Sequence, residues 1–503
     1  MVMTASTDPP SWDSPHDANG VAGVDGYDAR AIEFSVNGLA TRLPEYSAHK
    51  RFSLGQRIGI GVTIVGIIAA FATNPIATGT VGMTALMVLY VGMLWMRIDL
   101  AVRGRGDQRV RFTDEELAAI DRDSLPTFSI LVPAYKEPQV MPHLVANLAA
   151  LVYPRHKLEI KLLLEEDDEA TIAAAAALNL TAPFEVIIVP PVGPRTKPKA
   201  LNYALLGCRG DIICIYDAED HPDPDQLMKV AATFAKLGER VGCVQAELAY
   251  YNANENLITR WFAVEYRMWF TQFLPALART NAAIPLGGTS NHMRRELLIK
   301  LGAWDPYNVT EDADLGIRAA AVGLKVGITE STTWEEACSE WKSWIRQRTR
   351  WIKGYMVTAL VHTRRPRQLW RETGWRGYLG LIGLIAGTPA MFLACPLVWG
   401  FWLFTFLGGS IPGFHIAPWL QIAMTANLII GNGAMVVLAA VAALRRKAYD
   451  LVPFSLLNPA YWILHSIAAW RALYQLIVSP SHWEKTPHGI VHGPDAQRAA
   501  ESA

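Results

Sequence analysis

Two long segments without a charged residue constrain this chain more than any other feature of its sequence. No Asp, Glu, Lys or Arg occurs between Arg57 and Arg97, nor between Arg376 and Arg445. A helix that crosses a bilayer needs about 20 mostly apolar residues, so each segment has room for two helices. Turn-forming residues divide both segments, at Asn74-Pro75 in the first and between Gly408 and Gly413 in the second. The pattern predicts four membrane-spanning helices rather than two buried hairpins of a soluble core.

The overall composition agrees with a membrane protein that also has a large soluble part. Hydrophobic residues make up 51% of the 503 residues, charged residues make up only 18%, and the mean hydropathy is +0.16. The formal net charge is zero, which gives no electrostatic support for a nucleic-acid partner. The five cysteines are scattered and form neither a disulfide framework nor a metal-ligand cluster, so a reducing compartment is expected.

Basic residues gather at corresponding ends of the predicted spans, which sets the orientation. They precede the first and third spans and follow the second and fourth, whereas both short connecting loops lack charge. Under the positive-inside rule the region between the second and third spans is cytoplasmic, in a multi-pass protein of the bacterial inner membrane. The basic residues are Lys50, Arg51 and Arg57; Arg97, Arg103, Arg105, Arg109 and Arg111; Arg364, Arg365, Arg367, Arg371 and Arg376; and Arg445, Arg446 and Lys447.

These features divide the chain into five parts. Residues 1–48 are expected to be a mobile tail, 52–97 a pair of membrane helices, 98–365 a cytoplasmic domain, 366–448 an interface helix and a second membrane pair, and 449–503 a C-terminal segment. Two parts have an alternative. Residues 31–39 could pair with the domain as part of an ordered cap, and Leu451 to Val478 could be a fifth span rather than the favoured interface helix.

The cytoplasmic domain alternates short strands with helices. Such alternation predicts an α/β fold with a mostly parallel sheet that is covered on both faces. In these sheets the ligand lies beyond the carboxyl ends of the strands. The predicted strands are Phe128 to Val132, Leu158 to Leu164, Phe184 to Val189 and Asp211 to Tyr216, and the predicted helices are Val140 to Leu151, Glu169 to Leu178 and Pro198 to Leu206.

Polar clusters follow these strands. The first strand leads into Pro133 to Pro138, the second into the acids Glu165 to Glu169, and the fourth into Asp217 to Asp220, while Lys197 and Lys199 lie in the loop after the third. An acidic run on its own is equally consistent with a solvated surface and with a binding site. Because the clusters share one edge of the predicted sheet, they indicate a binding site there.

Asp217 and Glu219 have the chemistry and spacing of ligands for a hard cation. One residue separates the two carboxylates, which directly follow a buried strand, and Mg²⁺ and Mn²⁺ prefer such oxygen ligands. A bound cation of this kind stabilises the charge that develops on a leaving nucleoside diphosphate. Asp220 is expected instead to cap the helix that begins near Pro222.

Two later motifs carry groups suited to glycosyl transfer. Glu311 and Asp312 are carboxylates of the type that serves as general base for an acceptor hydroxyl. The segment from Gln347 to Trp351 combines two guanidinium groups, which can clamp a diphosphate, with an indole that offers an apolar face to a sugar ring. A helix on the membrane surface, with tryptophans in the interface and arginines on lipid phosphates, is the alternative for this segment.

The ordered set of motifs resembles that of family 2 glycosyltransferases of the membrane-embedded synthase type, such as bacterial cellulose and hyaluronan synthases. The matching pieces are VPAYKEP, the acids after the second strand, TKPKALN, DAED, TED and Q-x-x-R-W, in family order over residues 128–351. The DAED motif and the C-terminal end look more like bacterial exopolysaccharide synthases. The resemblance implies a GT-A domain inserted between transmembrane helices, an inverting mechanism, and Mg²⁺ or Mn²⁺ as the metal.

The resemblance also implies a role for individual residues. Asp312, with Glu311, would be catalytic; Asp217 and Glu219 would hold the metal, although Glu219 stands where the family has a second Asp. Donor binding would fall to Tyr135, Glu137, Glu166, Asp168, Lys199 and Asp217, with the contacting acid of Glu165 to Asp168 left open. The diphosphate and acceptor would contact Gln347, Arg348, Arg350, Trp351, Gly288 and Thr289, and a gating loop would contribute Lys485, Thr486 and His488.

The resulting hypothesis is a polysaccharide synthase. It would transfer a hexose from a nucleotide sugar, UDP-glucose or another UDP-hexose, to a growing glycan, with the bilayer and a self-associated copy or export protein as partners. The alternatives are transfer of a single sugar to a lipid carrier and a non-catalytic membrane receptor or scaffold.

Overall fold

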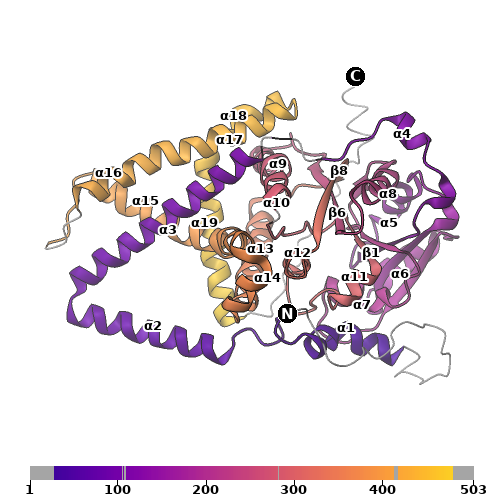
Figure 1. The fold of residues 1–503 in the computed structure, drawn as a ribbon, viewed down its shortest axis with the longest axis horizontal. Coiled ribbons are helices and arrows are strands. Elements are labelled where there is room, and N and C mark those ends of the chain that lie inside the picture. Colours follow the sequence, from indigo (N-terminus) through magenta and orange to yellow (C-terminus); the bar gives the residue numbers. More distant parts are fainter. Residues whose placement is uncertain (1–27, 105, 107–108, 281, 413–416, 480–503) are drawn as a thin grey trace.

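The computed structural model describes residues 28–104, 106, 109–280, 282–412 and 417–479. Figure 1 shows an α/β domain on one side of the molecule and a set of long helices that project from the other side. The predicted gating loop, with Lys485, Thr486 and His488, lies outside the described residues.

The α/β domain is built on one eight-stranded sheet in the order β3-β2-β1-β4-β7-β6-β8-β5. The four strands predicted from the sequence, β1 to β4, are confirmed and are mutually parallel. The second half is mixed, because β7 runs antiparallel to both β4 and β6. The strands are β1 (Phe128–Ala134), β2 (Leu158–Glu165), β3 (Phe184–Val189), β4 (Ile212–Ile215), β5 (His221–Pro222), β6 (Val241–Tyr250), β7 (Asn291–Arg294) and β8 (Lys325–Glu335).

Helices cover both faces of this sheet, as its continuous apolar strands require. Side chains of α5, α6 and α8 pack with the sheet in one core, and those of α7, α11 and α12 pack in another. The three helices predicted between the strands are confirmed as α5, α6 and α7. The helices are α4 (Asp114–Ala118), α5 (Met141–Ala149), α6 (Glu169–Ala177), α7 (Lys197–Leu205), α8 (Gln226–Leu237), α9 (Leu257–Met268), α10 (Leu274–Thr280), α11 (Arg295–Lys300) and α12 (Glu311–Ala321).

The remaining helices connect this domain to the membrane segment. A π-helical turn joins α9 to α10 and two others interrupt the long C-terminal helices. These elements are η4 (Trp269–Phe273), α13 (Trp341–His362), α14 (Pro366–Gly380), η5 (Leu381–Ala386), α15 (Gly387–Phe406), α16 (Pro418–Ala426), η6 (Asn427–Gly431), α17 (Asn432–Arg445), α18 (Val452–Ser455) and α19 (Asn458–Val478).

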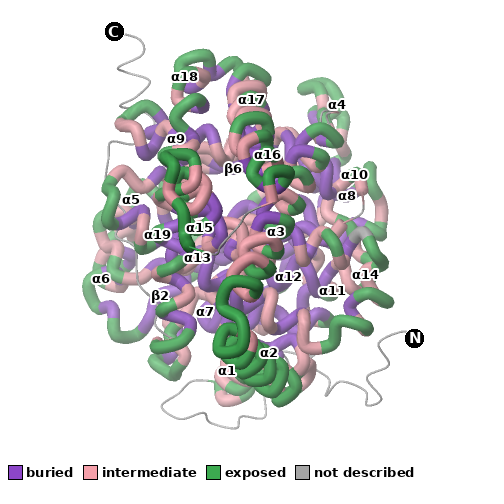
Figure 2. Tube along the Cα trace, turned by 90° about the vertical axis from the view of Figure 1, so that its left-hand side faces the viewer, coloured by how far each residue is buried: buried purple, intermediate pink, exposed green. Residues whose placement is uncertain are grey.

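Four helices in the described part of the chain are long and apolar enough to cross a membrane. They are α2 (Leu54–Thr73), α3 (Pro75–Arg103), a continuous helix over Gly377–Phe406, and another over Pro418–Arg445. A capping box between Ser53 and Gln56 begins α2. The turn predicted at Asn74-Pro75 is present: Asn74 accepts a hydrogen bond from the backbone of Ala77 and Pro75 opens α3. Figure 2 shows that α2 is exposed along its length, as expected of a helix that contacts lipid.

The helix α19, predicted to lie at the interface, is not one of these four. It packs mainly against α13 and α15, and in Figure 1 it runs across the direction of α3 and α17, between these helices and the α/β domain.

The N-terminal region differs from the prediction of a mobile tail over residues 1–48. Residues 29–42 form α1 (Ala29–Arg42), which packs on α7 and buries Phe34 and Leu39. The alternative of an ordered cap therefore describes these residues better, although as a helix. The sequence did not indicate this helix, because its average hydrophobicity is low and only the face that packs on α7 is apolar.

Candidate active site

Five chain segments converge at one edge of the sheet. Since β4, β6 and β8 are parallel to β1, their carboxyl ends lie at the same edge, and the antiparallel β7 begins there. The backbone of Ser290, just before β7, donates to the carbonyl of Ile215 at the end of β4. This pairing brings Gly288 and Thr289 beside the Asp217 turn.

A cavity of about 680 Å³ opens at this edge and continues between the long helices. Its acidic end is lined by acids from the ends of β1, β2, β4 and β8 and from α12, with Lys197, Arg195 and Arg350 as cations. Its other end is lined by residues of α3, α15, α17 and α19, which include Leu94, Met391, Phe392, Met435 and Trp462. One space therefore joins the acidic site to the membrane helices.

Lys197 occupies the centre of the acidic end. Its Nζ forms an ion pair with Asp217 and donates to the carbonyl of Gly288 at 2.7 Å. A Cβ built on Gly288 would lie 3.5 Å from Oδ2 of Asp312, so the backbone here passes close to that carboxylate. Burial disfavours the charge of Lys197, but Asp217 and Glu311 outweigh it and raise the pKa of the lysine. Lys197 thus interacts both with Asp217, after β4, and with Glu311, in α12.

The paired acids Glu311 and Asp312 lie in the first turn of α12. Burial raises both pKa values, with the neighbouring carboxylates adding to it, to about 8 for Glu311 and about 6 for Asp312. The two acids are adjacent, and both line the cavity. The carboxylate of Asp312 also lies close to the backbone of Gly288 in the cavity wall.

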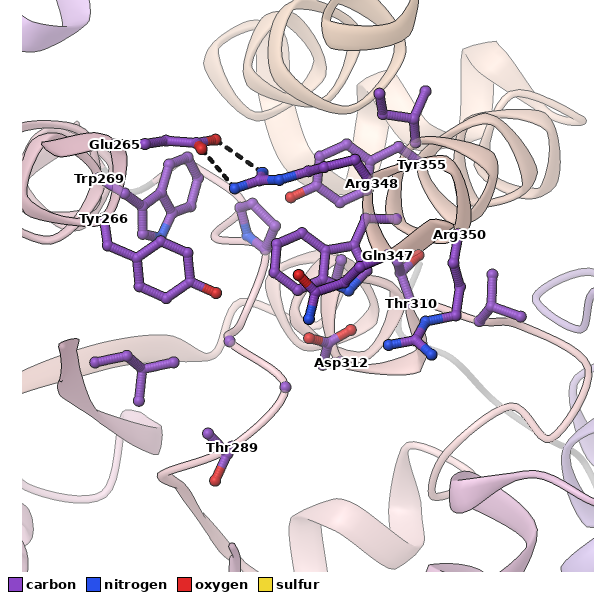
Figure 3. Close-up of a pocket in the computed structure, with 18 of the residues that line it drawn as sticks. Glu265, Tyr266, Trp269, Thr289, Thr310, Asp312, Gln347, Arg348, Arg350 and Tyr355 are labelled. Carbon is purple, nitrogen blue, oxygen red and sulfur yellow. Dashed lines mark hydrogen bonds and ion pairs between the residues drawn. The ribbon is translucent and has the colours of Figure 1, made fainter. Parts of the chain in front are cut away.

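The face of α13 that lines the cavity carries Gln347, Trp351 and Tyr355, at a spacing of four residues. Figure 3 shows Asp312 between this helix and the Gly288–Thr289 segment, with Gln347 and Arg350 beside it. Glu311, Asp217 and Glu219 support the charge of Arg350 against the burial that lowers its pKa. Arg350 therefore lies among the carboxylates of the acidic end of the cavity.

Arg348, predicted to contact the diphosphate or the acceptor, lines the cavity but is also engaged within the protein. Its Nη1 donates to Oε1 of Glu265 at 2.9 Å and its Nη2 donates to Oε2, while its guanidinium stacks over Phe262 and Trp351. In Figure 3 this pair lies away from Asp312. Adjacent residues of a helix point about 100° apart, so Gln347 and Arg348 face different parts of the cavity.

Two predicted donor-binding residues are engaged elsewhere. Lys199 is fully buried and donates to both oxygens of Glu165, at 2.9 and 3.1 Å, and to the carbonyl of Pro190. Asp168 caps α6 and accepts a hydrogen bond from the backbone of Lys136. Both side chains stabilise the loops at this edge of the sheet, and neither lines the cavity.

Of the other acids after β2, Glu166 is exposed and lies outside the cavity lining. Asp167 forms an ion pair with Arg195 and accepts from the hydroxyl of Tyr135 at 3.4 Å. Tyr135, Glu137 and Arg195 line the cavity as a group, as does Glu165 beneath them. The predicted Tyr135 and Glu137 are thus at the cavity, whereas Glu166 is not.

Thr289 and Asp220 also have roles that the sequence did not indicate. Asp220 is fully buried and does not cap α8; it accepts from the backbone of Asp217 at 2.7 Å and from the Thr289 hydroxyl. Thr289 therefore holds the turn that carries Asp217 and Glu219, although it also borders the cavity. Gly288 lies in the cavity wall as predicted.

The charge around Asp217 and Glu219 bears on whether they could hold a metal. Glu335, at the end of β8, is half-buried near Asp217, Glu219 and Asp220; burial and these three negative charges raise its pKa well above its ordinary value. Among the described residues, no three His, Cys, Asp or Glu side chains are arranged as a ready-made group of metal ligands. The two carboxylates of Asp217 and Glu219 nevertheless have the oxygen chemistry that Mg²⁺ and Mn²⁺ prefer. Sequence reasoning did not single out Glu335 or Tyr355, and it placed Lys197 after the third strand without giving it a role.

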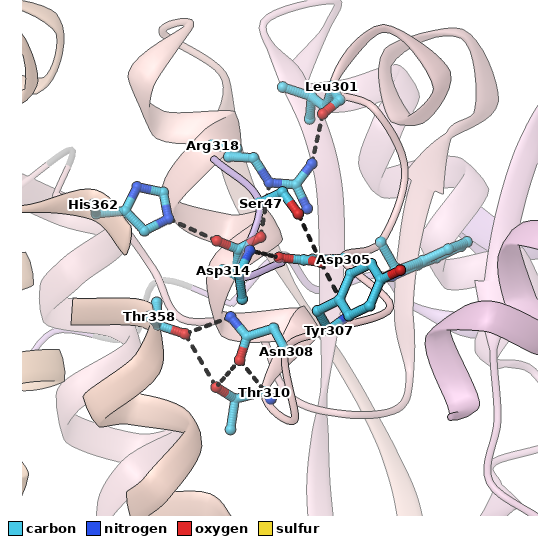
Figure 4. Close-up of polar contacts among 12 residues, drawn as sticks. Ser47, Leu301, Asp305, Tyr307, Asn308, Thr310, Asp314, Arg318, Thr358 and His362 are labelled. Atoms are coloured by element: carbon cyan, nitrogen blue, oxygen red, sulfur yellow. Dashed lines mark hydrogen bonds and ion pairs between the residues drawn. The ribbon is translucent and has the colours of Figure 1, made fainter. Parts of the chain in front are cut away.

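A buried polar network fixes α12 against α13 behind the site (Figure 4). Asp314 contacts Arg318 at 2.8 Å and His362 at 2.7 Å. Asn308 donates to Thr358 of α13 at 2.8 Å and accepts from the backbone of Thr310. Thr310 directly precedes α12, so this network sets the position of Asp312.

Residues 126–354 match the family model described as "Glycosyltransferase like family 2". The chain is 32% identical over 245 residues to the probable glycosyltransferase YdaM of Bacillus subtilis, covering 47% of this chain and 57% of that protein. It is 29% identical over 266 residues to the beta-monoglucosyldiacylglycerol synthase of Trichormus variabilis, covering 52% of each. The chain thus spans about half the length of these relatives.

Among solved structures, the fold is similar to that of the mannosyltransferase PcManGT from Pyrobaculum calidifontis, in complex with GDP-Man and Mn²⁺. The TM-score is 0.53 at 19% identity, over 79% of this chain and 98% of that one. Fold and site together define a GT-A-type α/β domain flanked by apolar helices. Residues 126–354 form a glycosyltransferase domain of family 2.

Proposed function

We propose that this protein transfers a hexose, with inversion, from a nucleotide sugar to a hydroxyl of an acceptor that enters the site from the membrane. The observation that carries the proposal is the single cavity that joins Asp312 to the membrane helices. A donor made in the cytoplasm and an acceptor held in the bilayer would meet in that space.

In this proposal the donor lies along the sheet edge, with its nucleoside near Tyr135 and Glu137. Asp217 and Glu219 would hold Mg²⁺ or Mn²⁺, which supplies positive charge to the leaving diphosphate. Lys197 and Arg350 would add hydrogen bonds to the same diphosphate. Asp312 would accept the proton of the acceptor hydroxyl, because its carboxylate lines the cavity close to the backbone of Gly288.

Two acceptors are consistent with the relatives, among which are a glycolipid synthase and probable glucomannan mannosyltransferases. Apolar side chains in the membrane half of the cavity favour a lipid-linked acceptor. Trp351 in the cavity wall favours a sugar as the group that receives the hexose, and so supports the growing glycan predicted from the sequence. UDP-glucose or another UDP-hexose remains our proposed donor, and the inner membrane, with the domain cytoplasmic, our proposed location.

The test is transfer of radiolabelled hexose by the purified chain in nanodiscs made from bacterial membrane lipids. Label recovered in the organic phase as one product supports a lipid acceptor, whereas label in long water-soluble polymer supports the synthase. Label in neither fraction, with every donor and both metals, would contradict the proposal. Asp217→Asn should abolish incorporation, and the exposed Asp225→Asn is its matched control.

A further inference from the structure

The membrane half of the cavity contains a cation without a carboxylate partner. Arg97 of α3 lines the cavity, and its Nη2 donates to Oγ1 of Thr388. Within the described residues it has no ion pair, and its Nε is buried without a hydrogen-bond acceptor. Because a guanidinium stays protonated, an uncompensated one among apolar side chains is costly. This position therefore calls for an anion.

The acid that acts on Arg97 is already neutralised. Glu265 influences Arg97 electrostatically, but both of its oxygens accept hydrogen bonds from Arg348, and one also accepts from the hydroxyl of Tyr461 at 2.8 Å. Two guanidinium groups and one carboxylate leave one positive charge in excess. The acidic end has the opposite excess, so an anion that enters the membrane half has its counter-charge at Arg97.

A second donor without an acceptor lies deeper in the same space. Asn432 is buried in the cavity wall, and its Oδ1 accepts from the hydroxyl of Tyr90 at 3.0 Å, which fixes the amide. Its Nδ2 has no hydrogen-bond partner among the described residues. Tyr90, Leu94 and Arg97 lie on one face of α3, so Asn432 and Arg97 are at successive depths of one wall. The wall therefore carries two hydrogen-bond donors that have no acceptor among the described residues.

The position of Arg97 along α3 indicates which anion it would bind. It lies six residues before Arg103, the last residue of α3 and close to the catalytic domain, which is about 9 Å along the helix. Lipid phosphates are found near the ends of membrane-spanning helices. Farther from Arg103 than Arg97, the wall presents Leu94, and Met435 of α17 also lines it; both suit a hydrocarbon chain.

We propose that Arg97 and Thr388, with Asn432 deeper in the wall, form a subsite for the phosphate of a lipid-linked acceptor. The guanidinium binds the phosphate through two hydrogen bonds, and the apolar chain lies along the membrane half of the cavity. This inference rests on the proposed function and specifies its acceptor as a phosphate-bearing lipid. A neutral lipid such as diacylglycerol would leave Arg97 uncompensated.

The test is binding of matched lipids to the full chain in detergent, measured by native mass spectrometry. The probes are dioleoyl phosphatidic acid and dioleoylglycerol, which share their acyl chains and differ in the phosphate. We expect at least tenfold tighter binding of phosphatidic acid, loss of that preference in Arg97→Gln, and partial retention in Arg97→Lys. Arg103→Gln is the control, because this exposed arginine pairs with Asp99 and lies outside the cavity lining.

Equal binding of the two lipids, or a preference that survives Arg97→Gln, would overturn the proposal. Displacement of phosphatidic acid by stoichiometric inorganic phosphate would show that a free anion, not a lipid, is bound. If Arg97→Gln fails to fold, Thr388→Val gives the same comparison. The proposed function is tested separately by the release of nucleoside diphosphate in the absence of an acceptor. If the nucleotide is released but phosphatidic acid is not preferred, only the subsite is contradicted. If phosphatidic acid is preferred but no nucleotide is released, only the enzyme activity is contradicted.

Discussion

Nε2 of His362 lies 2.7 Å from Oδ1 of Asp314, and both side chains are completely buried where α13 crosses α12. The same carboxylate accepts from Arg318, so one acid serves two nitrogen groups from different elements. Asp314 follows Asp312 by two residues. The contact therefore ties the position of the proposed base to the helix that carries Gln347, Arg350 and Trp351.

Asp314→Asn should destabilise the protein strongly. The change leaves the guanidinium of Arg318 buried without its counter-charge, which costs about 3–5 kcal/mol in comparable pairs. The measurement is the melting temperature of the purified protein in detergent. Asp225→Asn, which breaks an exposed pair with Lys229, is the control and should cost less than about 1 kcal/mol. Equal melting temperatures for the two variants would contradict a structural role for Asp314.

Gly354→Ala should reduce turnover without changing donor affinity. A methyl group there would lie 2.4 Å from Cγ2 of Thr310, so α13 would have to move away from the start of α12. A displacement of this kind near a base lowers rates by about 100-fold in favourable cases. Steady-state kcat and donor KM are the readouts, and Gly400→Ala, where no atom lies within 4 Å of the new methyl, is the control. An unchanged kcat would show that this packing does not position Asp312.

The pH dependence of transfer should report Asp312. Burial raises its pKa to about 6, and a general base works only when deprotonated. We therefore expect kcat to be constant above pH 7 and to fall about tenfold per pH unit well below pH 6. Asp312→Asn should lose about 100-fold to 10,000-fold in rate and show no such fall. A variant with the wild-type profile would assign the titration to another group.

Lys197→Gln and Lys199→Gln should separate donor binding from stability. Lys197 contacts Asp217 within the cavity, so its replacement should raise donor KM by more than tenfold. Lys199 is buried against Glu165, and its replacement should lower the melting temperature and affect KM less. Donor titrations and thermal unfolding on both variants decide this. The reverse pattern would restore the sequence-based assignment to Lys199.

The two lysines show why the sequence predicted the site only in part. Runs of branched apolar residues identified β1 to β4, and the acids after the fourth run placed Asp217 and Glu219 at the cavity. The choice between Lys197 and Lys199 depends on which side of α7 faces the cavity, and two positions separated by two residues point in nearly opposite directions.

Other differences arise from contacts between distant parts of the chain. Asp168 and Thr289 have side chains suited to a ligand, but each is used by a loop that the sequence does not place beside it. Glu265 pairs with Arg348 across 83 residues, which no local pattern reveals. Helix α1 has one apolar face, and that face packs on α7. Element types followed from local pattern, whereas the partners of buried polar groups followed from the tertiary fold.

The central claim is tested most directly by the release of nucleoside diphosphate from a panel of UDP- and GDP-sugars, with Mg²⁺ or Mn²⁺ and with EDTA. The account predicts release from one donor class that requires the metal and falls at least 100-fold in Asp312→Asn. Release that is unaffected by EDTA and by Asp312→Asn, or no release from any donor in native lipids, would contradict it.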